Sequence, residues 1–306
     1  TAHDQDRSLK RFSPNSDLDV TRLRDSISWS MTQLRPFRER YEQAIRMYAG
    51  QRFGENTGLD KMPLNLFRQV IDIWCRQLVS ANPRALVLSR SADLRVGAFE
   101  MEIALNYLLD LIGFGKSLGE VARSAVFMVG AMKVGITNDF PLDTHVFSPE
   151  SGAPYATPIL FDDLILDLNA RRLEESDFIG HRFRAPYDLV MDNADYDEGV
   201  LAKLAPSDVN SATDDLADDT GRTNKLSSGD SIERNEFRQH VELMEIWTPI
   251  RGGLLITLPV QAGLKPLQVR EWTGPSNPTG PFHVLAFNPV LGNVLPSAPA
   301  QNIFDI

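Results

Sequence analysis

Three aspartates in one short span have the residue type and spacing that most resemble a metal site. Asp162, Asp163 and Asp167 lie close together, and paired carboxylates can hold a divalent metal. In an extended strand, Asp163 and Asp167 share a face with Ile165, and Asp162 points to the other face. We expect exposed charges on a strand edge, which oppose edge-to-edge pairing. We therefore predict no metal site, and we keep a metal-dependent hydrolase or nuclease as the alternative function.

The other patterns that could carry chemistry are weaker. Cys75 is the only cysteine, which excludes an intrachain disulfide, and we expect a packed, inert thiol. The five histidines show no metal-ligand spacing. The run 113–119 imitates a dinucleotide-binding fingerprint, but it follows a helix, so a helix-to-helix turn is expected. No phosphate-binding loop or nucleophile elbow occurs, and we predict no catalytic residue and no cofactor.

The composition indicates a globular chain with a large core. Of the 306 residues, 42% are hydrophobic and 24% are charged. No apolar run reaches the length of a membrane span, so no membrane partner is predicted. The formal net charge is −10, whereas proteins that grip nucleic acid by its phosphates are usually basic. The chain is therefore expected either not to bind nucleic acid or to let it pass without holding it.

Hydrophobic periodicity predicts a helical N-terminal half. Residues 1–16 are polar and are expected to form a flexible arm, and residues 17–139 are expected to be mainly helical. A first helical stretch should run from Asp17 to about Tyr48, with a kink or a junction of two helices at Pro36. A second helix should run over 65–81 with an apolar face made of Leu66, Val70, Ile73, Trp74 and Leu78. A strand is predicted over 84–89, followed by two helices, 98–112 and 118–128.

The remainder of the chain favours strands. Residues 140–296 are rich in proline and β-forming residues and include a polar, acidic stretch, 206–231, that we expect to be a mobile loop. Residues 297–306 have the pattern of a helix start. The predicted fold class is thus α+β, with an N-terminal helical half packed against a strand-rich half.

Two Gly/Pro-rich turns surround an apolar strand near the end of the chain. Proline fixes φ and glycine permits turns that other residues cannot adopt, so this segment should form a rigid elbow with the two large aromatic residues packed on the body. The residues of this predicted elbow are Trp272, Gly274, Pro275, Gly280, Pro281, Phe282, Pro289, Gly292 and Pro296.

This segment resembles the one that precedes the stem helix in portal proteins, the head-to-tail connectors of tailed phages. The resemblance rests on two stretches of sequence, Glu271-Trp-Thr-Gly-Pro and Gly280-Pro-Phe-His-Val-Leu-Ala-Phe-Asn-Pro. Weaker elements occur in the expected order before it and extend the resemblance over 25–306. They are Arg38 to Gly50, Asn65-Leu-Phe67, Ala81-Asn-Pro-Arg84, 98–111, 121–135, Phe161 to Ala170 and Glu242 to Trp247.

The resemblance implies a structural, non-enzymatic role. Portals are rings of identical subunits, typically twelve, at one capsid vertex of the virion, and they are assembled in the host cytoplasm. The implied partners are the major capsid protein, the head-tail adaptor, the terminase, and double-stranded DNA that passes through the channel without sequence specificity. The chain would hold mainly the wing, with the stem helix beginning at its C-terminal end. Another head-completion or capsid protein remains an alternative.

Arginines are frequent in the first predicted helix. The simplest expectation is a solvated face with Glu39 and Glu42 as local partners. The alternative hypothesis is contact with an acidic neighbour, either a second subunit, which we favour, or nucleic acid; the candidate subunit contacts are Arg35, Arg38, Arg40 and Arg46.

Deletion of Ser211–Ser228 tests the prediction of a mobile loop. The deletion removes few apolar groups, so we expect the variant to remain folded with a thermal midpoint close to that of the parent, measured by calorimetry. Unfolding of the variant would show that a structural element lies within 206–231.

Overall fold

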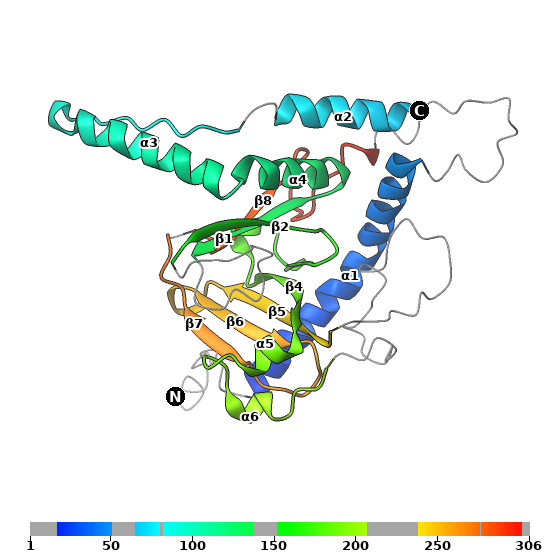
Figure 1. Ribbon diagram of the computed structural model, residues 1–306. Coiled ribbons are helices and arrows are strands. Elements are labelled where there is room, and N and C mark those ends of the chain that lie inside the picture. Colours follow the sequence, from blue (N-terminus) through cyan, green and yellow to red (C-terminus); the bar gives the residue numbers. More distant parts are fainter. Residues whose placement is uncertain are drawn as a thin grey trace, which may run out of the picture.

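The computed structural model describes residues 17–50, 65–79, 82–136, 152–206, 238–275 and 277–301. Helices dominate the N-terminal half and antiparallel strands the C-terminal half, which confirms the α+β prediction (Figure 1). The predicted flexible arm 1–16 and nearly all of the predicted mobile loop 206–231 lie outside the described residues, as do residues 302–306 of the predicted stem segment. At position 301 the structure begins a helical turn.

The first helix, α1 (Asp17–Ala49), is continuous through Pro36 and ends at Gly50, whose φ of 85° favours glycine. Pro36 therefore lies within one helix, and two helices do not meet there. Its apolar stripe is buried along the whole length, with Ile27 and Leu34 fully inaccessible to solvent. Tyr41, on the same stripe, makes edge-to-face contacts with Phe127 and Phe161. Burial raises the pKa of its hydroxyl to about 12.

The larger sheet, sheet B, has five antiparallel strands in the order β3-β4-β5-β6-β7. These strands are β3 (Leu164–Leu166), β4 (Ile179–Pro186), β5 (His240–Thr248), β6 (Leu254–Pro259) and β7 (Gln268–Glu271). Gly252 and Gly253 adopt positive φ in the turn between β5 and β6, a conformation that favours glycine. The short helices α5 (Tyr187–Met191) and α6 (Glu198–Leu201) pack at one end of this sheet with Leu243 and Leu267.

The smaller sheet, sheet A, has the order β2-β1-β8 and is also antiparallel. Its strands are β1 (Gly130–Ile136), β2 (Pro154–Ile159) and β8 (Phe282–Leu285). Helix α4 (Phe114–Phe127) packs on this sheet so closely that a Cβ added at Gly130 would lie 2.1 Å from the carbonyl oxygen of Val121. Sheet A thus depends on β8, which comes from the far end of the chain.

A buried ion pair joins the two sheets. Lys133 of β1 contacts the carboxylate of Glu245 of β5, and both side chains are almost inaccessible to solvent. Arg270 of β7 donates a 3.2 Å hydrogen bond to the other oxygen of Glu245. Burial lowers the pKa of Lys133, and Glu245 offsets this only in part. Burial alone would raise the pKa of Glu245, but Lys133, His181 and Arg270 together hold it below its ordinary value.

Substitution of Glu245 tests the importance of this ion pair. Glu245→Gln leaves Lys133 buried without its counter-charge, and we expect the free energy of unfolding to fall by about 3–5 kcal/mol. The double variant Lys133→Met/Glu245→Gln removes the orphaned charge and should recover much of that loss. Urea unfolding of both variants checks the expectation, and a Glu245→Gln variant with unchanged stability would contradict it.

Candidate subunit interface

Residues 82–111 form an arm that projects from the body of the protein (Figure 1). The arm consists of an extended segment, 82–89, a short turn of 3-10 helix (Ala92–Leu94) and helix α3 (Arg95–Leu111). Gly113, with a φ of 63°, joins α3 to α4 and provides the predicted helix-to-helix turn. No residue of the arm is buried within this chain.

Helix α3 has large apolar residues over most of its surface and one polar stripe, Glu102, Asn106 and Asp110, which faces the extended segment. Only four of its 17 residues, Arg95, Glu100, Glu102 and Asp110, carry a charge. Exposed apolar side chains in such number are normally covered by other protein. The large apolar side chains that the arm exposes by more than half are Leu86, Leu88, Leu94, Val96, Phe99, Met101, Ile103, Tyr107 and Leu111.

The exposed apolar area of the arm is that of a protein–protein interface. A large side chain presents roughly 150–250 Å², so the nine side chains together expose on the order of 1,000 Å². A stable interface of standard size buries about 800 Å² on each partner. Monomeric proteins rarely expose apolar patches larger than a few hundred Å². The arm is therefore a surface that a partner protein is expected to cover.

Side chains of α3 hold the extended segment in place. The amide of Asn106 accepts a 2.9 Å hydrogen bond from the backbone N–H of Ala85 and donates a 3.0 Å bond to the carbonyl oxygen of the same residue. Glu102 accepts a bond from the N–H of Val87, and Asn82 donates to Asp110. The arm is thus an ordered hairpin whose helix and extended strand are joined along their length.

Helix α2 (Leu66–Leu78) has a second exposed apolar face. Asn65 caps the helix by accepting a bond from the N–H of Arg68. The side that packs on the body consists of Phe67, Ile71 and Cys75. The sequence-predicted apolar face is the other side, of which Leu66, Ile73, Trp74 and Leu78 are exposed and Val70 is half-buried. The periodicity of residues 65–81 correctly predicted an apolar stripe on α2, but the described part of the chain leaves most of that stripe exposed.

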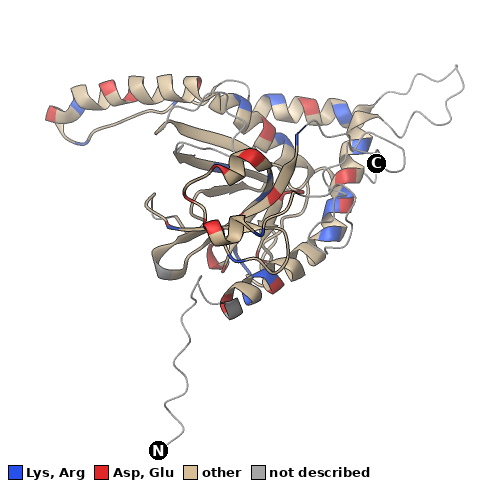
Figure 2. Cartoon of the chain, turned by 60° about the horizontal axis from the view of Figure 1, so that its bottom comes forward, with Lys and Arg blue, Asp and Glu red and all other residues tan. Residues whose placement is uncertain are grey.

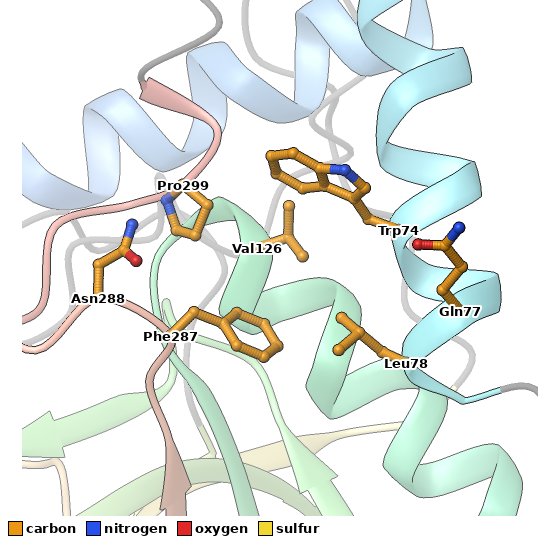
Figure 3. Close-up of a pocket in the computed structure, with 7 residues that line it drawn as sticks. All are labelled: Trp74, Gln77, Leu78, Val126, Phe287, Asn288 and Pro299. Atoms are coloured by element: carbon orange, nitrogen blue, oxygen red, sulfur yellow. The ribbon is translucent and has the colours of Figure 1, made fainter.

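A hollow of about 410 Å³ lies beside this face (Figure 3). Helix α2 supplies one side and the segment after β8 the other, as Figure 3 shows. Its lining residues are Trp74, Gln77, Leu78, Val126, Phe287, Asn288 and Pro299. The hollow is mainly apolar and combines the exposed face of α2 with the end of the described chain.

The four arginines predicted as subunit contacts are not gathered into one site. Arg35 lies 3.7 Å from Glu39, and Arg46 lies 2.6 Å from Glu42. Arg40 stacks over the ring of Phe37, and Arg38 donates a hydrogen bond to the carbonyl oxygen of Leu164. Figure 2 shows basic and acidic residues intermingled along α1. The local pairs match the simpler expectation of a solvated helix face.

The predicted elbow packs on the body through its first half. Phe282 is fully buried, and Thr279 donates a hydrogen bond to its carbonyl oxygen. Trp272 is half-buried and donates a 2.9 Å bond to the carbonyl oxygen of Pro275. A Cβ at Gly274 would lie 2.2 Å from the Trp272 ring, and one at Gly280 would lie 2.3 Å from Trp247. These two glycines therefore allow the chain to cross the indole rings closely.

The second half of the elbow connects β8 to the last described residues. Pro281 and Pro296 are buried, Pro275 and Pro289 are exposed, and Gly292 has a φ of 77° in an exposed turn. The N–H of Ser297 donates to Asn288, and the N–H of Ala300 donates to the carbonyl oxygen of Val126. The segment is therefore fixed to helix α4 before the described chain ends.

The expectation of exposed strand-edge charges was wrong for Asp162 and Asp167, which are both buried, whereas Asp163 is partly exposed. Asp167 is buried and accepts bonds from the N–H groups of Asn169 and Asp177. Asp163 lies 3.9 Å from Arg182. Within the described parts of the chain, no group of three or more His, Cys, Asp or Glu side chains has the arrangement of a metal site. Cys75 is half-buried, and burial raises the pKa of its thiol, which disfavours the reactive thiolate.

No protein-family model and no curated protein sequence matches this chain. Among the helices of the described segments, none has the length and apolar character needed to cross a membrane. Sequence reasoning predicted a helix over 98–112 but did not predict that its apolar residues would be exposed. A signal that could have pointed to an exposed arm was the polar stripe Glu102, Asn106 and Asp110, which bonds the extended segment and leaves the large apolar residues outside it.

Two glutamates in the arm test whether it is an interface. Val96→Glu/Phe99→Glu changes exposed side chains, so the free energy of unfolding of the monomer should change by no more than about 0.5 kcal/mol per substitution. Loss of central apolar contacts should weaken self-association by about 2 kcal/mol or more, or roughly 30-fold. Light scattering after gel filtration measures the mass. Leu160→Glu, an exposed apolar residue on the body, is the matched control, and equal effects of both changes would contradict the assignment.

Proposed function

We propose that this chain is the wing portion of a subunit of a phage portal, a closed ring at the capsid vertex through which DNA is packaged and ejected. The observation that carries the proposal is the arm of residues 82–111, whose large apolar side chains are mostly exposed and none of whose residues is buried within the chain. A permanent homo-oligomeric interface is the usual partner of such a surface, since obligate interfaces are larger and more apolar than transient ones.

The arrangement of the apolar surfaces favours a ring over a two-fold dimer. The arm extends to one side of the body, and the hollow beside α2 is a different surface (Figure 1, Figure 3). Contacts between two different surfaces of identical copies are heterologous, and they generate closed rings when the rotation between copies closes. Two-fold dimers instead use one self-complementary patch on both subunits.

The C-terminal segment supports the wing assignment. Phe282, Ala298 and Ala300 are fully buried, and the latter two lie within the last few described residues. A helix that continues from position 301 would therefore leave from a fixed base. Such a base is what a stem helix that bears load in a ring requires, and it accords with the resemblance of residues 271–299 to the portal segment.

The charge of the chain suits a channel through which DNA moves. Each phosphate that a protein neutralises adds to the cost of moving the DNA onward. The net charge is −10, Arg35 and Arg46 pair with glutamates of the same helix, and Arg38 and Arg40 contact Leu164 and Phe37. The proposed partners are further copies of this chain, the major capsid protein, the head-tail adaptor and the terminase, with double-stranded DNA passing through the channel without sequence specificity.

Imaging of the purified full-length protein tests the proposal. Negative-stain microscopy, with a mass measurement on the same sample, should show closed rings of about twelve copies with a central channel. The arm variant Val96→Glu/Phe99→Glu should show single subunits at the same concentration. A protein that remains a monomer or a two-fold dimer would overturn the proposal. Divalent-metal-dependent nuclease activity that Asp163→Ala abolishes would instead favour the alternative of an enzyme.

A further inference from the structure

We propose that residues 84–88 form an edge strand that pairs, in the assembled protein, with an extended segment of a second copy of this chain. The inference rests on the proposed function only in requiring that copies associate. It adds a specific mode of contact, in which backbone hydrogen bonds continue from one subunit into the next.

The first observation is that this segment is extended without belonging to a sheet. The sequence Arg84-Ala-Leu-Val-Leu-Ser predicts a strand, but the structure assigns no strand here. Side-chain exposure nevertheless alternates as in a strand, with Ala85 and Val87 half-buried and Leu86 and Leu88 exposed by 72% and 81%. The segment therefore has the extended conformation of the predicted strand, but among the described residues it has no neighbouring strand to pair with.

The second observation is that one edge of the segment is already occupied. Asn106 bonds both the N–H and the carbonyl oxygen of Ala85, which are the two groups that a neighbouring strand would pair. Glu102 accepts a bond from the N–H of Val87. Side chains of α3 thus take the place of a strand on this edge and hold the segment straight.

The opposite edge is open. Successive residues of an extended chain direct their backbone groups to alternate edges, so Leu86 and Leu88 direct theirs away from α3. In the described part of the chain, no hydrogen bond to the N–H or carbonyl oxygen of these two residues is present. An exposed strand edge of this kind is a template for pairing with another chain.

A second copy is the occupant that the surface favours. The open edge belongs to the same arm whose apolar side chains expose on the order of 1,000 Å², more than the 800 Å² or so that each partner contributes to a stable interface. A partner that covers the apolar side chains of the arm also brings its backbone next to the open edge of the extended segment, between Arg84 and Arg90. So apolar a surface needs a partner at all times. Another copy of the chain meets this requirement, because it is always present where the chain is.

A proline substitution tests the backbone contact. Leu86→Pro removes the outward N–H and leaves the bonds of Ala85 and Val87 to α3 intact, and proline accepts an extended residue before it. Leu86→Thr is the matched control, since it loses the leucine side chain but keeps the N–H. We expect both monomers to fold normally and the proline variant to associate at least about tenfold more weakly than the threonine variant.

Hydrogen exchange on the assembled full-length protein provides the second readout. The amides of Leu86 and Leu88 should exchange at least about 100-fold more slowly in the assembly than in the monomeric Val96→Glu/Phe99→Glu variant, while Ala85 is protected in both. If rings form but these amides exchange at the monomer rate and the two Leu86 variants associate equally, the edge-strand inference fails and the ring stands. If the purified protein stays monomeric, the proposed function fails as well, and a strand from a different protein is then the partner to seek.

Discussion

Large apolar side chains that a folded chain leaves in water are unfavourable unless a partner covers them, and this constraint governs the rest of the structure. Helix α3 has no buried residue within its own chain, although its composition is that of a core helix. Asn106 and Glu102 fix the extended segment against it, so the apolar surface is presented in one defined shape. A pre-organised surface loses less conformational entropy on association than a flexible one. The arm is thus suited to a permanent contact.

The body supplies a rigid base for that contact. Lys133 and Glu245 tie the two sheets together through a buried ion pair, and breaking such a pair is costly because one charge is left alone in the interior. Helix α4 connects the two functional regions, since the arm enters it at Gly113 and the C-terminal segment bonds to it at Val126. A force on the C-terminal segment would therefore reach the arm through a single packed helix. This connection is what a ring subunit that anchors a stem requires.

The sequence predicted those features that depend on local pattern. The α+β class, the helix end at Gly50 and the turn at Gly113 were predicted correctly, because periodicity and glycine act over a few residues. It could not predict which apolar face of a helix the chain covers. Trp74 and Leu78 were predicted to lie on the apolar face of α2, and they are exposed, whereas Phe67 and Ile71 pack on the core.

The same limit explains the remaining differences. The alternation in 84–89 indicated a strand, and the segment is extended, but a strand assignment also needs a partner that local sequence does not specify. The ion pair between Lys133 and Glu245 joins residues more than a hundred positions apart, and neither position showed a signal for pairing. The elbow could be proposed from the sequence because proline and glycine constrain the backbone locally. Contacts between distant segments, or between copies, leave no comparable mark on a single sequence.

Oxidative footprinting of Met101 on the full-length protein tests most directly whether another copy covers the arm. Met101 lies on α3 and is 58% exposed within the chain, whereas Met191, on α5 and 37% exposed, provides an internal reference away from the arm. If the account is right, Met101 is oxidised rapidly in the dissociated protein and at least about tenfold more slowly in the assembly, with Met191 changing little. Equal oxidation of Met101 in both states would show that the arm stays in water and would contradict the account.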